Sequence, residues 1–236
     1  MTKDPWKKIR QTCFGNIEPI VELLAVSSFV LKDSTNTDSV AYTESLPALS
    51  AGTSYDKKIS TIAEAKDLNK KLIRMEHLVP LESVQFNFSV KGISKACGAQ
   101  LSRHRIGQGH VSLSRRYTRQ KANFIYPLFD YIEEEPVVRS LYTQLSAYCE
   151  TSLIHYKSML DEGVKKQDSR LFMPVNVATE RSWWINARAL RDLFRLRLDP
   201  AAEWEIRRVS FILLDIVYTI TPSLFQDIYE KYVDIS

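Results

Sequence analysis

The sequence has few cysteines and few glycines, and both shortages exclude whole classes of function. Its three cysteines, Cys13, Cys97 and Cys149, lie far apart and form no CxxC pair. A disulfide framework and a cysteine zinc site are therefore excluded, and we expect free thiols in a reducing compartment. The seven glycines never occur in a GxxxxGK[ST] run, so a phosphate-binding P-loop is excluded as well.

Long apolar runs are also missing. The most apolar stretch, residues 209–225, is interrupted by Asp215 and Pro222 and is too short to span a bilayer. The first residues, MTKDPWKK, are charged and lack the apolar stretch of a secretory signal. We expect a cytoplasmic protein that does not contact a membrane.

Several familiar catalytic and cofactor motifs are absent. The sequence has no HExxH and no GxSxG, and its four histidines have no spacing typical of metal ligands. Gly107 and Gly109 lack the third glycine and the following helix pattern of a dinucleotide-binding turn. The sequence therefore predicts no metal site and no Rossmann turn.

Acidic residues are missing from residues 83–129, although the net charge of the whole chain is only +4. A second basic set lies downstream, with Arg170, Arg188 and Arg197 near Asn176 and Asn186. Because guanidinium forks suit phosphate oxygens, this charge predicts a phosphorylated ligand, with an uninvolved solvated surface and a nucleic-acid site as alternatives. The cations of the acid-free stretch are Lys91, Lys95, Arg103, Arg105, Arg115, Arg116, Arg119 and Lys121.

The composition of the 236 residues, 44% hydrophobic and 25% charged, is typical of a globular protein with a core. We expect one domain over residues 1–236, with a loop or insertion at residues 33–57. Residues 83–90 alternate between apolar and polar side chains, which predicts a half-buried, antiparallel strand. Helical spacing of apolar residues predicts helices elsewhere, and no regular βαβ alternation is present. The fold class is therefore α+β.

The expected helices are bounded by recognisable signals. The apolar spacing predicts helices over residues 60–76, 93–102, 135–160 and 181–196. Gly163 is a candidate C-cap of the third of these. Asp199-Pro200 and Thr221-Pro222 each combine an N-cap residue with proline at the first helical position, so both predict helix starts.

The stretch SRHRIGQGHVSLSRRYT, residues 102–118, resembles the signature of flavin-dependent thymidylate synthases: Arg-His-Arg, a spacer, and Ser-x-Arg-Tyr. The preceding histidine, proline-containing turn and alternating strand are similar to that family too. So is the downstream run from Gly163-Val164 through Ile-Asn-Ala-Arg to Glu-Trp-Glu-Ile. The resemblance covers roughly residues 60–230 and implies the family's fold.

The resemblance also implies the chemistry. These enzymes methylate carbon 5 of dUMP reductively, with methylenetetrahydrofolate as carbon donor, reduced FAD as hydride donor and NADPH as the reductant of the flavin. The family uses no cysteine nucleophile and forms homotetramers whose active sites are shared between subunits. The resemblance thus implies an enzyme with a uracil nucleotide as substrate and no nucleic acid as partner.

The family's functional residues can be carried over to matching positions of this sequence. The resemblance implies that Arg197 holds the pyrimidine carbonyl and that Ser114 is the second catalytic position. The residues implied to bind the nucleotide are Gln100, Ser112, Ser114, Arg116, Arg170 and Arg197. Those implied to bind FAD are His77, Arg103, His104, Arg105, Asn186 and Asp192.

The sequence departs from the family pattern in the same region. The spacer after Arg105 is one residue longer, so Leu113 stands where the family has its serine. Ser112 and Gln167 replace two glutamates, Val79 replaces a threonine, and Asp192 replaces an asparagine. Three alternatives stay open: a thymidylate synthase, a carbon-5 methylase of UMP or another uracil nucleotide, and a flavin- or nucleotide-binding homologue without turnover. A nucleic-acid-binding module is a fourth, more distant alternative.

Overall fold

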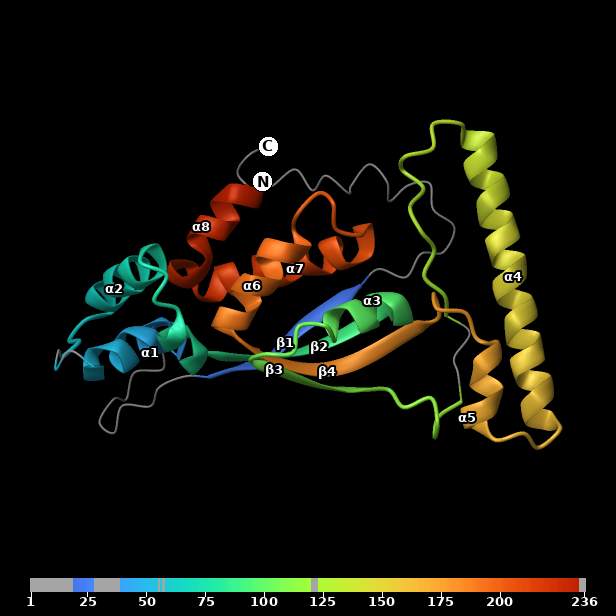
Figure 1. Ribbon diagram of the computed structural model, residues 1–236, viewed down its shortest axis with the longest axis horizontal. Helices are drawn as coiled ribbons and strands as arrows, with labels where there is room; N and C mark the ends of the chain where they lie inside the picture. The colour runs from blue at the N-terminus through green and yellow to red at the C-terminus, as the bar shows by residue number, and fades with distance from the viewer. Residues whose placement is uncertain (1–18, 28–38, 55, 57, 120–122, 234–236) are drawn as a thin grey trace. The chain divides into compact units, whose positions relative to one another are not determined.

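The computed structural model describes residues 19–27, 39–54, 56, 58–119 and 123–233 (Figure 1). The fold is α+β, as predicted, with one four-stranded antiparallel sheet in the order β1-β2-β4-β3. None of the helices in the described residues is long and apolar enough to cross a membrane. The strands are β1 (Ile20–Val26), β2 (Gln85–Ser94), β3 (Gln108–Ser112) and β4 (Ala178–Asn186).

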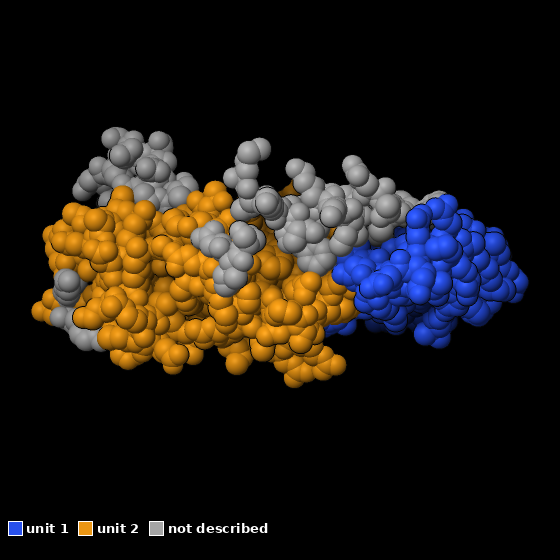
Figure 2. Space-filling view, turned by 90° about the horizontal axis from the view of Figure 1, so that it is seen from above, with its two compact units in different colours: residues 1–20, 90–101, 111–181 blue, residues 21–89, 102–110, 182–236 orange. Residues whose placement is uncertain are grey.

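The chain divides into two compact units, which Figure 2 shows in different colours. Unit 1 comprises residues 1–20, 90–101 and 111–181, and unit 2 comprises residues 21–89, 102–110 and 182–236. The boundaries fall within all four strands, so each strand contributes residues to both units.

The core of unit 2 is built on the strand that the alternation predicted. Val84, Phe86 and Phe88 are fully buried, whereas the residues between them are partly exposed. The Phe86 ring lies 6.1 Å from that of Phe225, which in turn lies 5.8 Å from that of Phe194. The helices of unit 2 are α1 (Ser39–Ser54), α2 (Ile62–Arg74), the 3-10 helix η1 (Val79–Ser83), α6 (Ala187–Arg197), α7 (Trp204–Ile220) and α8 (Pro222–Tyr232).

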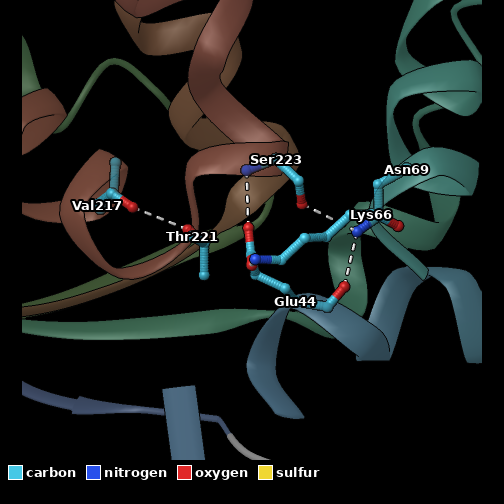
Figure 3. A network of polar contacts seen from close by, with 6 residues as sticks. All are labelled: Glu44, Lys66, Asn69, Val217, Thr221 and Ser223. Atoms are coloured by element: carbon cyan, nitrogen blue, oxygen red, sulfur yellow. Dashed lines mark hydrogen bonds and ion pairs between the residues drawn. The ribbon is translucent and has the colours of Figure 1, made fainter. Parts of the chain in front are cut away.

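A buried polar network joins α1, α2 and the start of α8 (Figure 3). The Glu44 carboxylate accepts a hydrogen bond from the Ser223 N–H at 2.7 Å and forms an ion pair with Lys66 at 2.9 Å. Asn69 Nδ2 donates to the Glu44 carbonyl at 2.6 Å. Because Glu44 is almost fully buried, the Ser223 N–H and the Lys66 ammonium offset the cost of removing its charge from water.

Unit 1 is organised around α4 (Glu135–Asp161). Cys149 and Tyr156 on this helix are buried against Phe124, Met173 and Val177. The helix ends at Asp161, and Gly163 follows its C-terminus. The φ of +84° at Gly163 and its N–H bond to the Leu160 carbonyl at 3.0 Å confirm the predicted cap. The other elements are α3 (Lys95–Leu101), α5 (Lys166–Ser169) and the 3-10 helix η2 (Arg170–Phe172).

Three expectations from the sequence are wrong. The loop over 33–57 is helix α1 across residues 39–54; the other described residue of that range, Asp56, lies in a turn. Residues 181–186 belong to strand β4, and helix α6 begins only at residue 187. Asp199 starts a turn rather than a helix, because its carboxylate accepts the N–H of Ala201 at 2.8 Å. The start signal at Thr221-Pro222 is confirmed by α8.

Candidate functional site

The Arg-His-Arg segment of unit 2 is held by a chain of side-chain hydrogen bonds. Trp183 on β4 is fully buried, and its Nε1 donates to Gln108 Oε1 at 2.5 Å. The amide nitrogen of Gln108 donates to the His104 carbonyl. A rigid, buried indole therefore fixes the backbone at His104 through a single intermediate side chain.

Asn186 fixes the same segment from the other side. Its backbone N–H donates to the Gly107 carbonyl at 2.8 Å, and its Oδ1 accepts the Ala189 N–H at 2.8 Å, which caps α6. Gly107 has a φ of +68°, and a Cβ at this position would lie 2.5 Å from Asn186 Nδ2. Only glycine fits here, so the turn lies directly against the N-terminus of α6.

His104 and Arg197, both predicted site residues, are joined by a hydrogen bond. The Nε–H of Arg197, at the end of α6, donates to His104 Nε2 at 3.0 Å. Burial lowers the pKa of His104 below 6.5, the charge of Arg197 lowers it further, and Asp192 opposes both. His104 is therefore neutral at pH 7, and since Nε2 accepts this bond, its proton lies on Nδ1.

Two guanidinium groups next to His104 extend into solvent. Arg103 and Arg105 are exposed, and within the described part of the chain neither has a hydrogen bond or an ion pair. Unpaired cations beside a neutral imidazole with a free N–H suit a ligand that combines a pyrophosphate with a polar ring. The donor set thus fits FAD.

His77 is placed separately, in the turn before η1. Its side chain is exposed, and no hydrogen bond among the described residues joins it to the other predicted flavin residues. Arg188, from the downstream basic set, forms an ion pair with Glu82 at 2.6 Å. Its charge is therefore already compensated within unit 2.

In unit 1, two neighbouring arginines have different environments. Arg115 is buried and donates to the carbonyls of Val177 and Ala178 at 3.2 and 3.0 Å. Burial lowers the pKa of Arg115, and the charge of Arg170 lowers it further. Arg116 is exposed, and its Nη2 lies 3.4 Å from the neutral Oε1 of Gln167. Arg115 therefore supports the fold, whereas Arg116 is available to an anion.

The remaining predicted nucleotide residues lie in the same unit. Ser114 is exposed in the turn after β3, and its carbonyl accepts the Thr118 N–H at 3.1 Å. Ser112 and Gln100 are half-buried, at the end of β3 and on α3, and Arg170 is exposed at the start of η2. Asn176 from the downstream set is used structurally, since its Nδ2 donates to the Ile125 carbonyl at 3.1 Å.

The predicted residues thus fall into two sets, one in each unit. Unit 2 contains the six predicted flavin residues together with Arg197, and unit 1 contains the other five nucleotide residues. Sequence reasoning missed Gln108 and Trp183 as supports of His104, and Lys165 and Lys166 as neighbours of Gln167. For Lys165 and Lys166, the available sequence signal was that they are two consecutive lysines. The structure places them opposite the basic Ser-x-Arg-Tyr segment.

Comparison with known proteins places the chain in a family. The family model described as thymidylate synthase complementing protein matches residues 37–223, which includes α1. A flavin-dependent thymidylate synthase of Thermosipho africanus is 30% identical over 75% of this chain and 82% of its own length. One from Pyrococcus furiosus is 33% identical over 63% of this chain. That match spans 62% of the Pyrococcus protein, less than two thirds of its length. The chain belongs to the thymidylate synthase complementing protein family.

Proposed function

We propose that this chain methylates carbon 5 of dUMP reductively, using FAD, methylenetetrahydrofolate and NADPH. The observation that carries the proposal is the hydrogen bond between Arg197 and His104, which joins the predicted pyrimidine residue to the predicted flavin motif. Two supports are the family membership and the flavin-dependent thymidylate synthases that this chain resembles at about 30% identity.

Arg197 is the residue that we assign to the reacting base. Its Nε is occupied by His104, which orients the guanidinium, while its two terminal nitrogens have no partner among the residues described. Those nitrogens are free to donate to a pyrimidine carbonyl. A donor that is oriented before the reaction stabilises negative charge developing on the ring, a contribution of about 3 kcal/mol in comparable sites.

The residues around His104 hold the flavin in this proposal. Arg103 and Arg105 bind its pyrophosphate, and neutral His104 donates from Nδ1 to a polar atom of the cofactor. Asn186 and Gln108 keep that backbone in place. Reduced FAD supplies the hydride when bound, and methylenetetrahydrofolate supplies the carbon.

Unit 1 supplies the residues that we assign to the phosphate end of the nucleotide. Arg116 and Arg170 are exposed guanidinium groups suited to its phosphate, and Ser114 adds a hydroxyl. Gln100 and Ser112 complete the predicted set. We also infer a homotetramer, because the family's active sites are shared between subunits; light scattering coupled to size-exclusion chromatography tests it.

The flavin spectrum of the purified chain tests the proposed activity. We expect FAD binding, a spectral change on adding dUMP, and formation of dTMP when methylenetetrahydrofolate and NADPH are present. Arg197→Gln should retain flavin and lose about 10²-fold in turnover. Arg195→Gln, an exposed position on the same helix, is the matched control and should retain turnover. Absence of flavin binding, or a response to UMP instead of dUMP, would contradict the proposal.

A further inference from the structure

Unit 1 contains a basic pocket of about 410 Å³ between the segment after β3 and the end of α4. One wall carries Arg116 and Arg119, and the other carries Lys165 and Lys166. The two walls are tied by Lys166, whose Nζ donates to the Tyr117 carbonyl at 2.7 Å. The other lining residues are Leu160, Gly163, Val164 and Gln167.

The end of α4 gives this pocket a fixed, uncharged floor. The N–H of Val164 donates to the Met159 carbonyl at 2.9 Å, and the N–H of Gly163 donates to that of Leu160 at 3.0 Å. These bonds close the last helical turn. Lys165 and Lys166 therefore follow directly on a hydrogen-bonded helix end.

The pocket has no compensating carboxylate. Throughout the part of the chain that the structure describes, none of its four cations forms an ion pair. The nearest acids along the chain, Asp161, Glu162 and Asp168, do not line it. Four unpaired positive charges around one concavity produce a local field that attracts an anion.

The amount of charge indicates which anion. A phosphate monoester carries about −1.5 to −2 at pH 7, which two arginines neutralise. The proposed function already places Arg116 and Arg170 on the phosphate of the nucleotide. Arg119, Lys165 and Lys166 then remain without an assigned partner of opposite charge.

We propose that Arg119, Lys165 and Lys166 form a second-phosphate subsite, so that this chain binds uracil nucleoside diphosphates more tightly than monophosphates. The subsite rests on the proposed function, because it continues from the phosphate assigned to Arg116. Arginine offers a planar fork to one phosphate edge, and the lysines act as point charges on the other oxygens. Gln167 contributes a neutral amide, which leaves the positive charge undiminished.

Isothermal titration of the full chain with four ligands tests the subsite. The ligands are inorganic phosphate, pyrophosphate, dUMP and dUDP, all at the same low ionic strength, because salt screens exposed charges. We expect pyrophosphate to bind about tenfold more tightly than phosphate, and dUDP about tenfold more tightly than dUMP. Equal affinities within each pair would overturn the proposal.

Variants locate the effect. Arg119→Gln combined with Lys165→Gln should reduce the preference for dUDP over dUMP to about twofold, because two charge-assisted contacts are lost. Lys157→Gln removes the same kind of charge from α4, outside the pocket lining, and should leave the preference unchanged. If the control reduces the preference as much as the double variant, long-range charge is responsible and no subsite exists.

Two further outcomes separate the possible explanations. If a short single-stranded oligothymidylate binds as tightly as dUDP and loses the same affinity in the double variant, the pocket serves nucleic-acid phosphates and the proposal is wrong. A chain that prefers dUDP but forms no dTMP would contradict the proposed function and leave the subsite standing. If the chain forms dTMP but does not prefer dUDP over dUMP, the proposed function stands and the subsite proposal is wrong.

Discussion

The helices α6 and α8 of unit 2 and the basic pocket of unit 1 use cations in opposite ways. In unit 2, the guanidinium of Arg191 is fully buried and pairs with both carboxylate oxygens of Asp227, at 2.6 and 2.8 Å. In the pocket, Arg116 contacts the neutral amide of Gln167 and lies 5.6 Å from the centre of the Tyr117 ring, with no carboxylate partner among the described residues. A buried charge needs its partner within the fold, whereas an exposed charge kept without one can accept a ligand.

From this comparison we expect the largest change in stability on substitution of Asp227. Asp227→Ala should lower the free energy of unfolding by about 3 kcal/mol, because it leaves the buried guanidinium of Arg191 unpaired. Urea unfolding at pH 7 measures this. Burial raises the pKa of Asp227, but the hydrogen bonds and charge of Arg191 outweigh it, so the pKa lies below 3.8. The contribution of this pair is present above that pH and is lost as the pH falls.

A matched double variant shows whether the unpaired charge is the cause. Arg191→Met with Asp227→Ala should be more stable than Asp227→Ala alone, since no charge then remains buried. A loss below about 1 kcal/mol in the single variant would show that Arg191 is compensated elsewhere, and the contrast with the pocket would fail.

Glu44 provides the second-largest expected effect. Glu44→Gln keeps an oxygen for the Ser223 N–H but removes the ion pair with Lys66, so we expect a loss of about 1–2 kcal/mol in the same unfolding measurement. Lys66→Gln leaves the buried Glu44 carboxylate without its cation and should cost more, about 2–3 kcal/mol. Equal losses in the two variants would show that burial of Glu44 does not decide the cost.

The lowered pKa of His104 makes the stability of the folded chain depend on pH. Its pKa in the folded chain lies below 6.5, so the unfolded chain binds more protons around that pH and stability is lost as the pH falls through 6.5. We expect the melting temperature of the native chain to fall more steeply between pH 7.5 and 5.5 than that of His104→Gln. Parallel curves would mean that neither burial nor the charge of Arg197 lowers the pKa of this imidazole.

The smallest change in stability is expected when a carboxylate is introduced into the pocket. Gln167→Glu places a negative charge beside Arg116, and we expect stability to change by less than about 0.5 kcal/mol. Titration should nevertheless show dUMP binding several-fold more weakly, because the new carboxylate competes for Arg116. Gln144→Glu on α4 makes the same charge change outside the pocket and serves as the control. Unchanged binding of dUMP to Gln167→Glu would remove Arg116 from the nucleotide site.

Local signals predicted much of the fold, and the failures have identifiable causes. The strand alternation at Val84, Phe86 and Phe88 and the cap at Gly163 are confirmed, because each depends on neighbouring residues alone. Strand β4 was missed although Arg181, Trp183 and Ile185 alternate inward, because an arginine occupies one of the buried positions. That arginine is tolerated there by its bond to the Gly98 carbonyl at 2.6 Å.

Helix α1 shows a different limit of sequence reading. Its residues are rich in serine, threonine and alanine, and Pro47 lies inside the helix. Such a segment has weak helical propensity of its own. Ala48, Ala51 and Glu44 are nevertheless buried, so packing and the Glu44 network hold the helix in place. Contacts with residues far along the chain carry this information, and the local pattern does not.

The sequence by itself determined the family, the α+β class and the residue types of the candidate site, because motif spacing and periodicity are local properties. Only the tertiary structure decided which of those residues are available to ligands. The charges of Arg188 and Arg191 are compensated by carboxylates from distant segments of the chain. Arg115 instead donates to backbone carbonyls, whereas Arg116 has no carboxylate partner among the described residues. The physical reason is that the state of a charge depends on its burial and its partners, and long-range packing sets both.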